Sequence, residues 1–223
     1  MALRDHSLDD KITNAAMDEF LDKGYMRASL RQIAAKAGVT VGAIQTRYSS
    51  KDELFTSLLT SFLEDIEAAF QAIRTDYYSG TGPNLLSCLQ SSMQHESEAI
   101  LHLIFSHYSE AVLLLYRSAG SSLEHAFDRL VKNKIEESIL FFNTAGYHDI
   151  DEKLLGLLIS SQFDSYRRII AECPDRQSAE FYMHSLMVYH SGGWNTLFHS
   201  FNMTKEDPDM YPVFWTPLFE LNN

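Results

Sequence analysis

Residues 29–48 read SLRQIAAKAGVTVGAIQTRY, and this stretch decides the fold. Ser29 and Gln32 form a capping box, in which the serine hydroxyl can accept from the Gln32 amide while the Gln32 side chain reaches back. The helix that begins there ends at Gly38, where a left-handed residue suits a tight turn. Thr40 then caps a second short helix. Two short helices joined by a turn at a glycine form a helix-turn-helix unit.

The charge of this region differs from that of the rest of the chain. Between Lys23 and Lys51 there are six basic residues and no Asp or Glu, whereas the whole chain has 18 Lys and Arg against 30 Asp and Glu, a net charge of -12. Residues 1–60 hold eight residues of each sign, so the negative surplus lies in residues 61–223. A basic segment at the front of an acidic body favours a polyanion as partner, contacted by that segment alone.

A second capping box, Ser50 with Glu53, begins a long helix and puts Lys51 in its first turn. A basic side chain there opposes the helix dipole, so we expect a nearby phosphate rather than stability to account for it. Arg31 and Lys36 fit DNA contacts and solvated helix faces equally well.

Nearly the whole chain is predicted to be helical, because apolar residues recur at three- and four-residue spacing between Gly, Ser and Pro breaks. We expect an all-α fold with an N-terminal three-helix helix-turn-helix domain and a larger helical bundle. The domains are residues 1–50 and 51–223, which share the helix from Lys51. The expected helices are one before Gly24, one from Ser29, one over Val41–Arg47, one from Lys51 to about Tyr77, and four over about 84–117, 121–145, 151–172 and 176–201. The last 20 residues are expected to form an extended tail packed on the body.

Several groups of residues between Ile12 and Leu59 form one dense pattern: Phe20, Gly24-Tyr25, residues 29–34, residues 37–44 and residues 48–54. With this pattern the stretch resembles the TetR family of bacterial transcriptional regulators. The resemblance implies a homodimer whose C-terminal domain binds a small effector and dimerises through its last two long helices. Family members mostly repress transcription, and effector binding releases them from a palindromic operator in double-stranded DNA.

The resemblance also implies DNA contacts. Phosphates would be held by Ser29, Gln45, Arg47 and Lys51, and base edges in the major groove would face Val41, Gly42, Ala43 and Thr46, with Tyr48 completing the DNA-binding set. Gln45 stands where the family usually has Tyr, so it can bond a phosphate or pair with N6 and N7 of an adenine. Arg47, where His or Tyr is common, can restore the phosphate contact.

Candidate effector and metal sites lie in the body. Aromatic and polar residues predict an effector pocket lined by His102, Phe105, Tyr108, Phe127, Phe163, Tyr166 and Arg167, although aromatics at helical spacing more often form core. Arg167 fits an anionic effector or, preferably, a structural partner such as Glu110. Cys88, His95 and His102 recur every seven residues, with Glu98 on the same stripe. Seven residues span about 10 Å of helix, too far for one ion, so no metal and no cofactor are expected.

The last two long helices carry apolar residues on more than one face, which predicts burial against the body and against a second copy. Leu158 and Leu197 are expected at that seam. Gly192 and Gly193 would cost about 1 kcal/mol each against Ala unless a partner's backbone approaches closely.

The sequence also argues against other classes of protein. We find no catalytic motif, so the chain is not expected to be an enzyme, and no catalytic residue is assigned. The longest apolar run, Ala111–Tyr116, is too short to span a membrane, and no signal peptide is visible, so we expect a cytoplasmic protein with two reduced thiols. The expected function is a transcriptional repressor released by a small molecule. The alternatives are a regulator controlled by a partner protein and an activator.

Overall fold

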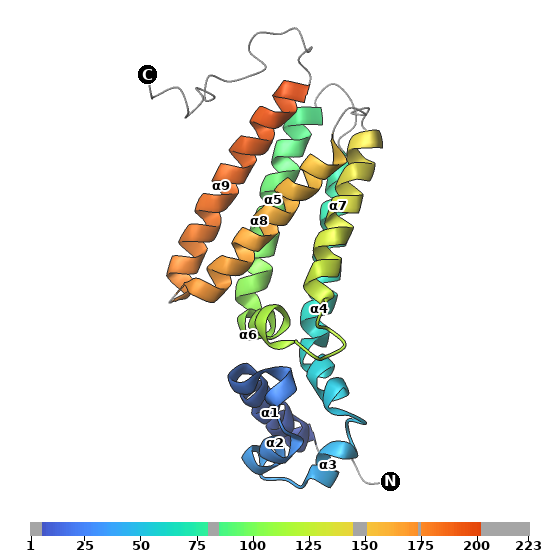
Figure 1. The fold of residues 1–223 in the computed structure, drawn as a ribbon, viewed down its shortest axis with the longest axis vertical. Coiled ribbons are helices and arrows are strands. Elements are labelled where there is room, and N and C mark those ends of the chain that lie inside the picture. The colour runs from blue at the N-terminus through green and yellow to red at the C-terminus, as the bar shows by residue number, and fades with distance from the viewer. Residues whose placement is uncertain (1–5, 80–84, 145–150, 174, 202–223) are drawn as a thin grey trace, which may run out of the picture.

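The computed structural model describes residues 6–79, 85–144, 151–173 and 175–201, and within these ranges all regular structure is helical (Figure 1). The all-α prediction is confirmed. The elements in chain order are α1 His6–Arg27, α2 Leu30–Ala37, α3 Val41–Gln45, α4 Lys51–Ser79, α5 Leu85–Ser106, α6 Tyr108–Val112, the π-helical turn η1 Leu113–Arg117, α7 Ala126–Thr144, α8 Glu152–Glu172 and α9 Arg176–Phe201.

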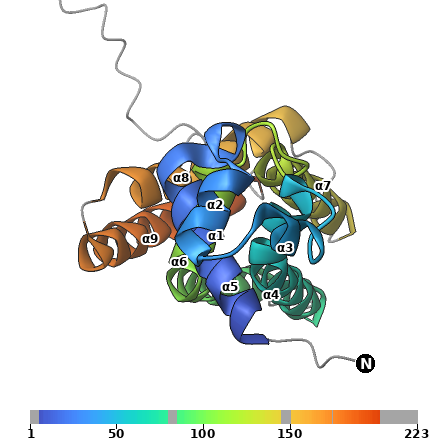
Figure 2. The same ribbon diagram turned by 90° about the horizontal axis from the view of Figure 1, so that it is seen from below.

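Helices α1–α3 form one end of the molecule, and α4 runs from α3 into the body (Figure 1). The predicted break at Gly24 is present as a kink inside α1, where the glycine has φ 70° and ψ 161°. The predicted turn at Gly38 is also present, with φ 68° and ψ 34°. Helix α3 ends two residues earlier than predicted. Seen from below, α1–α3 lie grouped over the ends of the body helices (Figure 2).

One continuous hydrophobic core joins this end to the body. It contains Ile12 and Phe20 from α1, Ile44 from α3, Phe55 from α4 and Leu113 from η1, all with no exposed surface. The ring of Phe55 meets that of Phe20 edge-on at 5.0 Å between centroids. Because η1 contributes to the core that α1 and α4 share, a shift of η1 must also displace side chains of α1 and α4.

The body is a bundle of α4, α5, α7, α8 and α9 (Figure 1). One cluster of buried apolar residues lies around Phe163 and Trp194 and includes residues of α7. Another lies around Tyr166 and Met183, with residues of α5 and α6 packed against it. These two clusters join α8 and α9 to the remaining helices.

The predicted helix over 84–117 is wrong, because the chain turns at His107, which has φ -125° and ψ 45°. The segments on either side of the break meet at 95°. The cause is tertiary: the His107 ring lies 5.4 Å from the Phe62 ring, and its Nε2 lies 2.9 Å from an Asp65 carboxylate oxygen, both on α4. The helix expected from residue 121 starts later, at Ala126.

Some predictions fall outside the described residues. These are the extended tail over the last 20 residues, the break between the helices over about 121–145 and 151–172, and the side chain of Cys88. Among the described residues no single helix has the length and apolar character to cross a membrane, and one bent pair, 98–106 with 108–117, meets that test by length and composition only.

Candidate nucleic-acid interface

The two helices of the helix-turn-helix unit are fixed by their caps. Thr40 Oγ1 accepts from the Ala43 amide at 3.1 Å, as predicted. Ser29 Oγ accepts from the Arg31 amide at 3.2 Å, not from Gln32, which corrects the predicted partner but keeps Ser29 as the N-cap of α2. Gly38 closes α2, and the Val39 amide bonds the Ala34 carbonyl at 2.9 Å. The turn between α2 and α3 is therefore determined locally.

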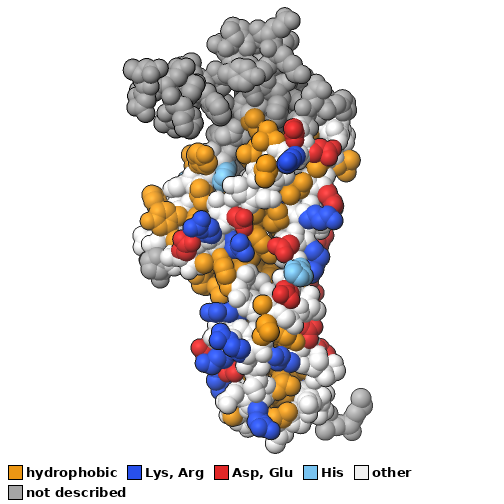
Figure 3. Space-filling model, in the orientation of Figure 1, with side chains coloured by type: hydrophobic (Ala, Val, Ile, Leu, Met, Phe, Trp, Pro, Cys, Tyr) orange, Lys and Arg blue, Asp and Glu red, His pale blue; other side chains and the backbone are white. Residues whose placement is uncertain are grey.

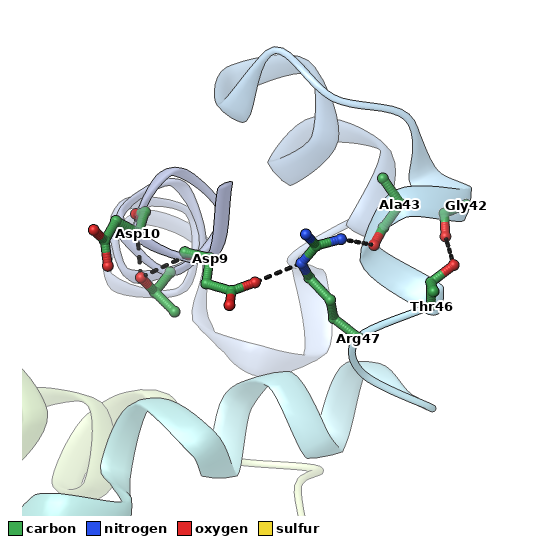
Figure 4. A network of polar contacts seen from close by, with 7 residues as sticks. Asp9, Asp10, Gly42, Ala43, Thr46 and Arg47 are labelled. Atoms are coloured by element: carbon green, nitrogen blue, oxygen red, sulfur yellow. Dashed lines mark hydrogen bonds and ion pairs between the residues drawn. The ribbon is translucent and has the colours of Figure 1, made fainter. Parts of the chain in front are cut away.

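Helix α3 buries one side and exposes the other. Ile44 is fully buried, whereas Gly42, Gln45 and Thr46 are exposed. Thr46 Oγ1 donates to the Gly42 carbonyl at 2.8 Å, so its hydroxyl hydrogen is already used (Figure 4). Of the other predicted base-facing residues, Val41 and Ala43 are half-buried, as is Tyr48. The exposed edge of α3 therefore offers the Gln45 amide and the Thr46 side chain.

Arg47 is held by α1. Its Nε pairs with Oδ1 of Asp9, and its Nη1 donates to the Ala43 carbonyl at 3.3 Å (Figure 4). The side chains of Arg47 and Asp9 are only 14% and 21% exposed. Arg47 thus links α3 to the start of α1. The predicted phosphate contact of Arg47 stays a prediction, and it would have to compete with Asp9.

Lys51 is held by the end of α1. Its Nζ donates to the carbonyls of Tyr25 at 2.7 Å and Ala28 at 3.2 Å, lies 3.5 Å from that of Met26, and sits 4.3 Å from the centre of the Tyr25 ring. A cation at the C-terminal carbonyls of a helix is stabilising. The argument that stability does not account for a lysine here is therefore wrong. Its phosphate contact stays a prediction.

Carboxylates of α1 neutralise further basic side chains of residues 23–51. Lys36 Nζ lies 2.8 Å from Oε2 of Glu19, a carboxylate with 5% exposure, and the hydrogen bond to Glu19 raises the pKa of Lys36. Lys23 pairs with Asp22 at 2.9 Å. Arg31 is exposed, and its guanidinium has no partner among the described residues. In Figure 3 basic side chains gather over the lower end of the molecule with a few acidic ones among them.

The second predicted capping box starts α4 with a shift of one residue. Ser50 Oγ accepts from the Glu53 amide at 3.0 Å, as predicted, but the Glu53 carboxylate accepts from the amide of Ser49 at 2.6 Å rather than from that of Ser50. These bonds from Ser49 lower the pKa of Glu53. The turn between α3 and α4 is thereby fixed, and with it the direction in which α4 leaves the helix-turn-helix unit.

A loop of the body docks against this end of the molecule. The Ser122 amide donates to Asp52 Oδ1 at 2.9 Å, and Asp52 also bonds the Tyr25 hydroxyl. Gly120, with φ 83°, lies so close to α1 that an added Cβ would stand 2.7 Å from Cγ of Met26. On the other side of this loop, the Tyr116 hydroxyl of η1 donates to the Arg167 carbonyl of α8. The loop therefore joins α8, through η1, to the end of α1.

The predicted effector-pocket residues divide into two groups. Phe127, Phe163 and Tyr166 are in contact, at 6.3 Å and 6.2 Å between successive ring centres, and Arg167 lies 5.7 Å above the Phe127 ring. Arg167 pairs with Asp164 at 3.1 Å, not with Glu110, and its Nε is buried without a partner among the described residues.

The second group is formed by Phe105 and Tyr108, which stack at 6.3 Å between ring centres. The Tyr108 hydroxyl donates to the Ile170 carbonyl of α8 at 3.1 Å. His102 is exposed and lies near Ser106 instead. His95 and Glu98 are also exposed, and the described residues contain no group of three metal-binding side chains.

Two polar contacts inside the bundle were not predicted from the sequence. Gln162 accepts from Trp194 Nε1 at 3.1 Å and donates to the Tyr166 hydroxyl at 2.8 Å. A buried ion pair joins Glu96 of α5 to Lys134 of α7 at 2.6 Å. The four-residue spacing of Gln162 and Tyr166 was a usable signal for the first contact. Nothing in the sequence indicates the second, because the partners are on helices that meet only in the folded bundle.

Comparison with known proteins agrees with this geometry. Residues 12–58 match the family described as "Bacterial regulatory proteins, tetR family". The chain is 25% identical over 138 residues to YhgD, an uncharacterized HTH-type transcriptional regulator of Bacillus subtilis (strain 168), over 60% of this chain and 71% of YhgD. It is 38% identical over 60 residues to the HTH-type transcriptional regulator SrpR of Pseudomonas putida, over 27% of this chain and 28% of SrpR.

Over most of its length the chain has a fold similar to that of a solved regulator. The transcriptional regulator FadR from Bacillus subtilis, in complex with stearoyl-CoA, superimposes with a TM-score of 0.55 at 15% identity, over 82% of this chain and 98% of FadR. The family match itself spans α1 to the first turns of α4, which are the elements of the candidate interface.

Proposed function

Since the chain belongs to the TetR family of bacterial transcriptional regulators, we propose that it is a repressor which a small molecule releases from a palindromic operator. The observation that carries the proposal is the exposed edge of α3, held in a fixed orientation by the Thr40 cap, the buried Ile44 and the Arg47 contacts. An exposed helix positioned in this way is what entry into a major groove requires. Regulation of transcription, and not catalysis, is the proposed activity.

The DNA contacts divide between the two helices. Ser29 at the start of α2 uses its oxygen as an acceptor in the cap, so its hydroxyl hydrogen remains for a phosphate. Arg31, exposed beside it, supplies a positive charge. Gly42, Gln45 and Thr46 on α3 face the bases. Backbone contacts then set the position of the helix, and base contacts select the sequence.

A dimer is proposed because α8 and α9 expose large apolar residues. Leu157 and Val188 are each 62% exposed, and Phe181 and Tyr189 are also exposed. A Cβ at Gly192 would meet no described residue within 4 Å, so packing among the described residues does not require this glycine. Close approach of a second copy does give it a role. Two copies related by a two-fold axis would present two α3 helices to a palindrome.

The effector is proposed to bind within residues 51–223, between helices of the bundle. Aromatic rings of Phe127 and Phe163 with the amide of Gln162 supply the apolar walls and the polar group that small-molecule sites combine. Tyr116 and Tyr108 tie α8 to the segment that leads to the DNA-binding end. A ligand that moves α8 can therefore change the position of α3.

The test is selection of bound sequences from a random pool of double-stranded DNA by the purified full chain. We expect a palindrome whose half-sites lie about one helical turn apart, 34–36 Å, and an affinity that falls steeply with salt. Small molecules that weaken binding to the selected DNA would then identify the effector. Recovery of no enriched sequence, with binding equal for all DNA, would overturn the proposal.

A further inference from the structure

The exposed edge of α3 contains no free cation. Its exposed residues are Gly42, Gln45 and Thr46, all neutral, and the nearest basic side chain, Arg47, is paired with Asp9. This is informative because guanine is most often read by Arg or Lys through its O6 and N7, whereas adenine is read by Asn or Gln through N6 and N7. The side chain in position to form two hydrogen bonds with a base is therefore that of Gln45.

Thr46 adds to this preference. Its hydroxyl donates to the Gly42 carbonyl, so the side chain has no hydrogen left to donate to a base, while its methyl group is available for contact (Figure 4). A threonine methyl in the major groove packs well against the methyl of a thymine. Gly42, one turn earlier on the same helix, presents no side chain and lets the backbone approach closely. Neighbouring A·T pairs satisfy both side chains.

Arg47 is held in place by two contacts, one to Asp9 and one to the backbone of α3. Both side chains are mostly buried, at 14% and 21% exposure, and the same guanidinium also bonds the Ala43 carbonyl of α3. Moving it to a phosphate would break both of these contacts, which tie α3 to the start of α1. The arginine therefore holds α3 against α1 while DNA is bound.

We propose that each operator half-site contains an A·T pair read by Gln45, with a thymine methyl against Thr46, and that Arg47 positions α3 and neutralises no phosphate. This inference rests on the proposed function, because it assigns the base contacts of the same helix. It concerns the recognised bases and the part played by Arg47, neither of which follows from DNA binding alone.

The base contact is tested by repeating the DNA selection with Gln45→Ala and Gln45→Arg. Gln45 is exposed, so neither change should disturb folding. The parent should prefer adenine at one position of each half-site by about 5- to 150-fold, Gln45→Ala should lose that preference alone, and Gln45→Arg should move it to guanine. A palindrome with guanine at that position, or a preference unchanged in Gln45→Ala, would sink the inference and leave the proposed function standing. Recovery of no palindrome would overturn both this inference and the proposed function.

The part played by Arg47 is tested by the salt dependence of binding. Each phosphate neutralised contributes about -0.9 to the log–log slope, so removing a phosphate contact flattens the slope of a dimer by about 1.8. We expect Arg31→Gln to do this, and Arg47→Gln to weaken binding to all sequences with no change of slope. Asp9→Asn is the second variant. It keeps Arg47 but removes the carboxylate charge that holds it. The freed guanidinium could then neutralise a phosphate, so the slope should become steeper.

Two results contradict the positioning assignment. One is a slope flattened by about 1.8 in a folded Arg47→Gln protein. The other is Arg47→Lys binding as tightly as the parent, because a lysine serves a phosphate as a point charge but cannot bridge Asp9 and Ala43 in the same way.

Discussion

Lys51 and Arg47 illustrate how partners decide the role of a charged residue. Both stand in a segment without a single acidic residue, so the sequence indicates free positive charge. In the structure Lys51 donates to carbonyls at the end of α1, and Arg47 pairs with Asp9, which lies 38 positions earlier in the chain. The equal count of charges in residues 1–60 was the available signal. That count showed that the positive charge is neutralised within residues 1–60, but it could not show which acidic residue pairs with which basic one.

At this scale we predict that Lys51→Ala lowers the stability of the protein. The change removes a cation hydrogen-bonded to the carbonyls of Tyr25 and Ala28, a type of contact that contributes about 1–3 kcal/mol. Urea denaturation of the two proteins measures the difference. Lys23→Ala is the matched control, because Lys23 makes only an exposed ion pair with its neighbour Asp22 and should change stability little. Equal stability of Lys51→Ala and the parent would contradict the assignment.

At the scale of elements, the sequence predicted the helix-turn-helix unit well because its determinants are local. Thr40, Gly38 and Ser50 act on backbone groups within a few residues, so their effects can be read from spacing. The break at His107 could not be predicted in this way. No glycine or proline stands there, and the turn depends on Phe62 and Asp65, which lie on another helix.

The loop after η1 is the element whose geometry is most constrained. We predict that Gly120→Ala destabilises the protein, because a residue with φ 83° costs about 1–2 kcal/mol for an L side chain and the new Cβ would stand 2.7 Å from Cγ of Met26. The double variant with Met26→Ala should recover the part due to the clash. Thermal unfolding of the four proteins of this cycle measures the coupling, and additive effects would show that the loop does not press on α1.

At the scale of the whole molecule, the body was predicted less completely than the DNA-binding end. Phe163 and Tyr166 were placed correctly together, but His102 was not, because its neighbours depend on where α5 ends. Leu158 and Leu197, the residues expected at a dimer seam, are half-buried and pack against the hydrophobic cluster around Phe163, and their place in a dimer stays a prediction. Helical periodicity showed that more than one face is apolar. It could not show which apolar face packs within the chain and which one remains exposed for a second copy.

The exposed face of α8 and α9 gives the corrected prediction for assembly. Leu157→Glu and Val188→Glu should yield folded monomers, because both side chains are 62% exposed in the single chain and a charge there disturbs only an interface. Leu158→Glu should instead impair folding, since that half-buried residue packs against the core cluster around Phe163. Leu140→Glu on α7, where the leucine is 59% exposed, is the control and should leave the dimer intact. Sedimentation velocity gives the mass and circular dichroism the folding of each variant. If Leu157→Glu and Val188→Glu both sediment as dimers at low concentration, the two copies meet elsewhere.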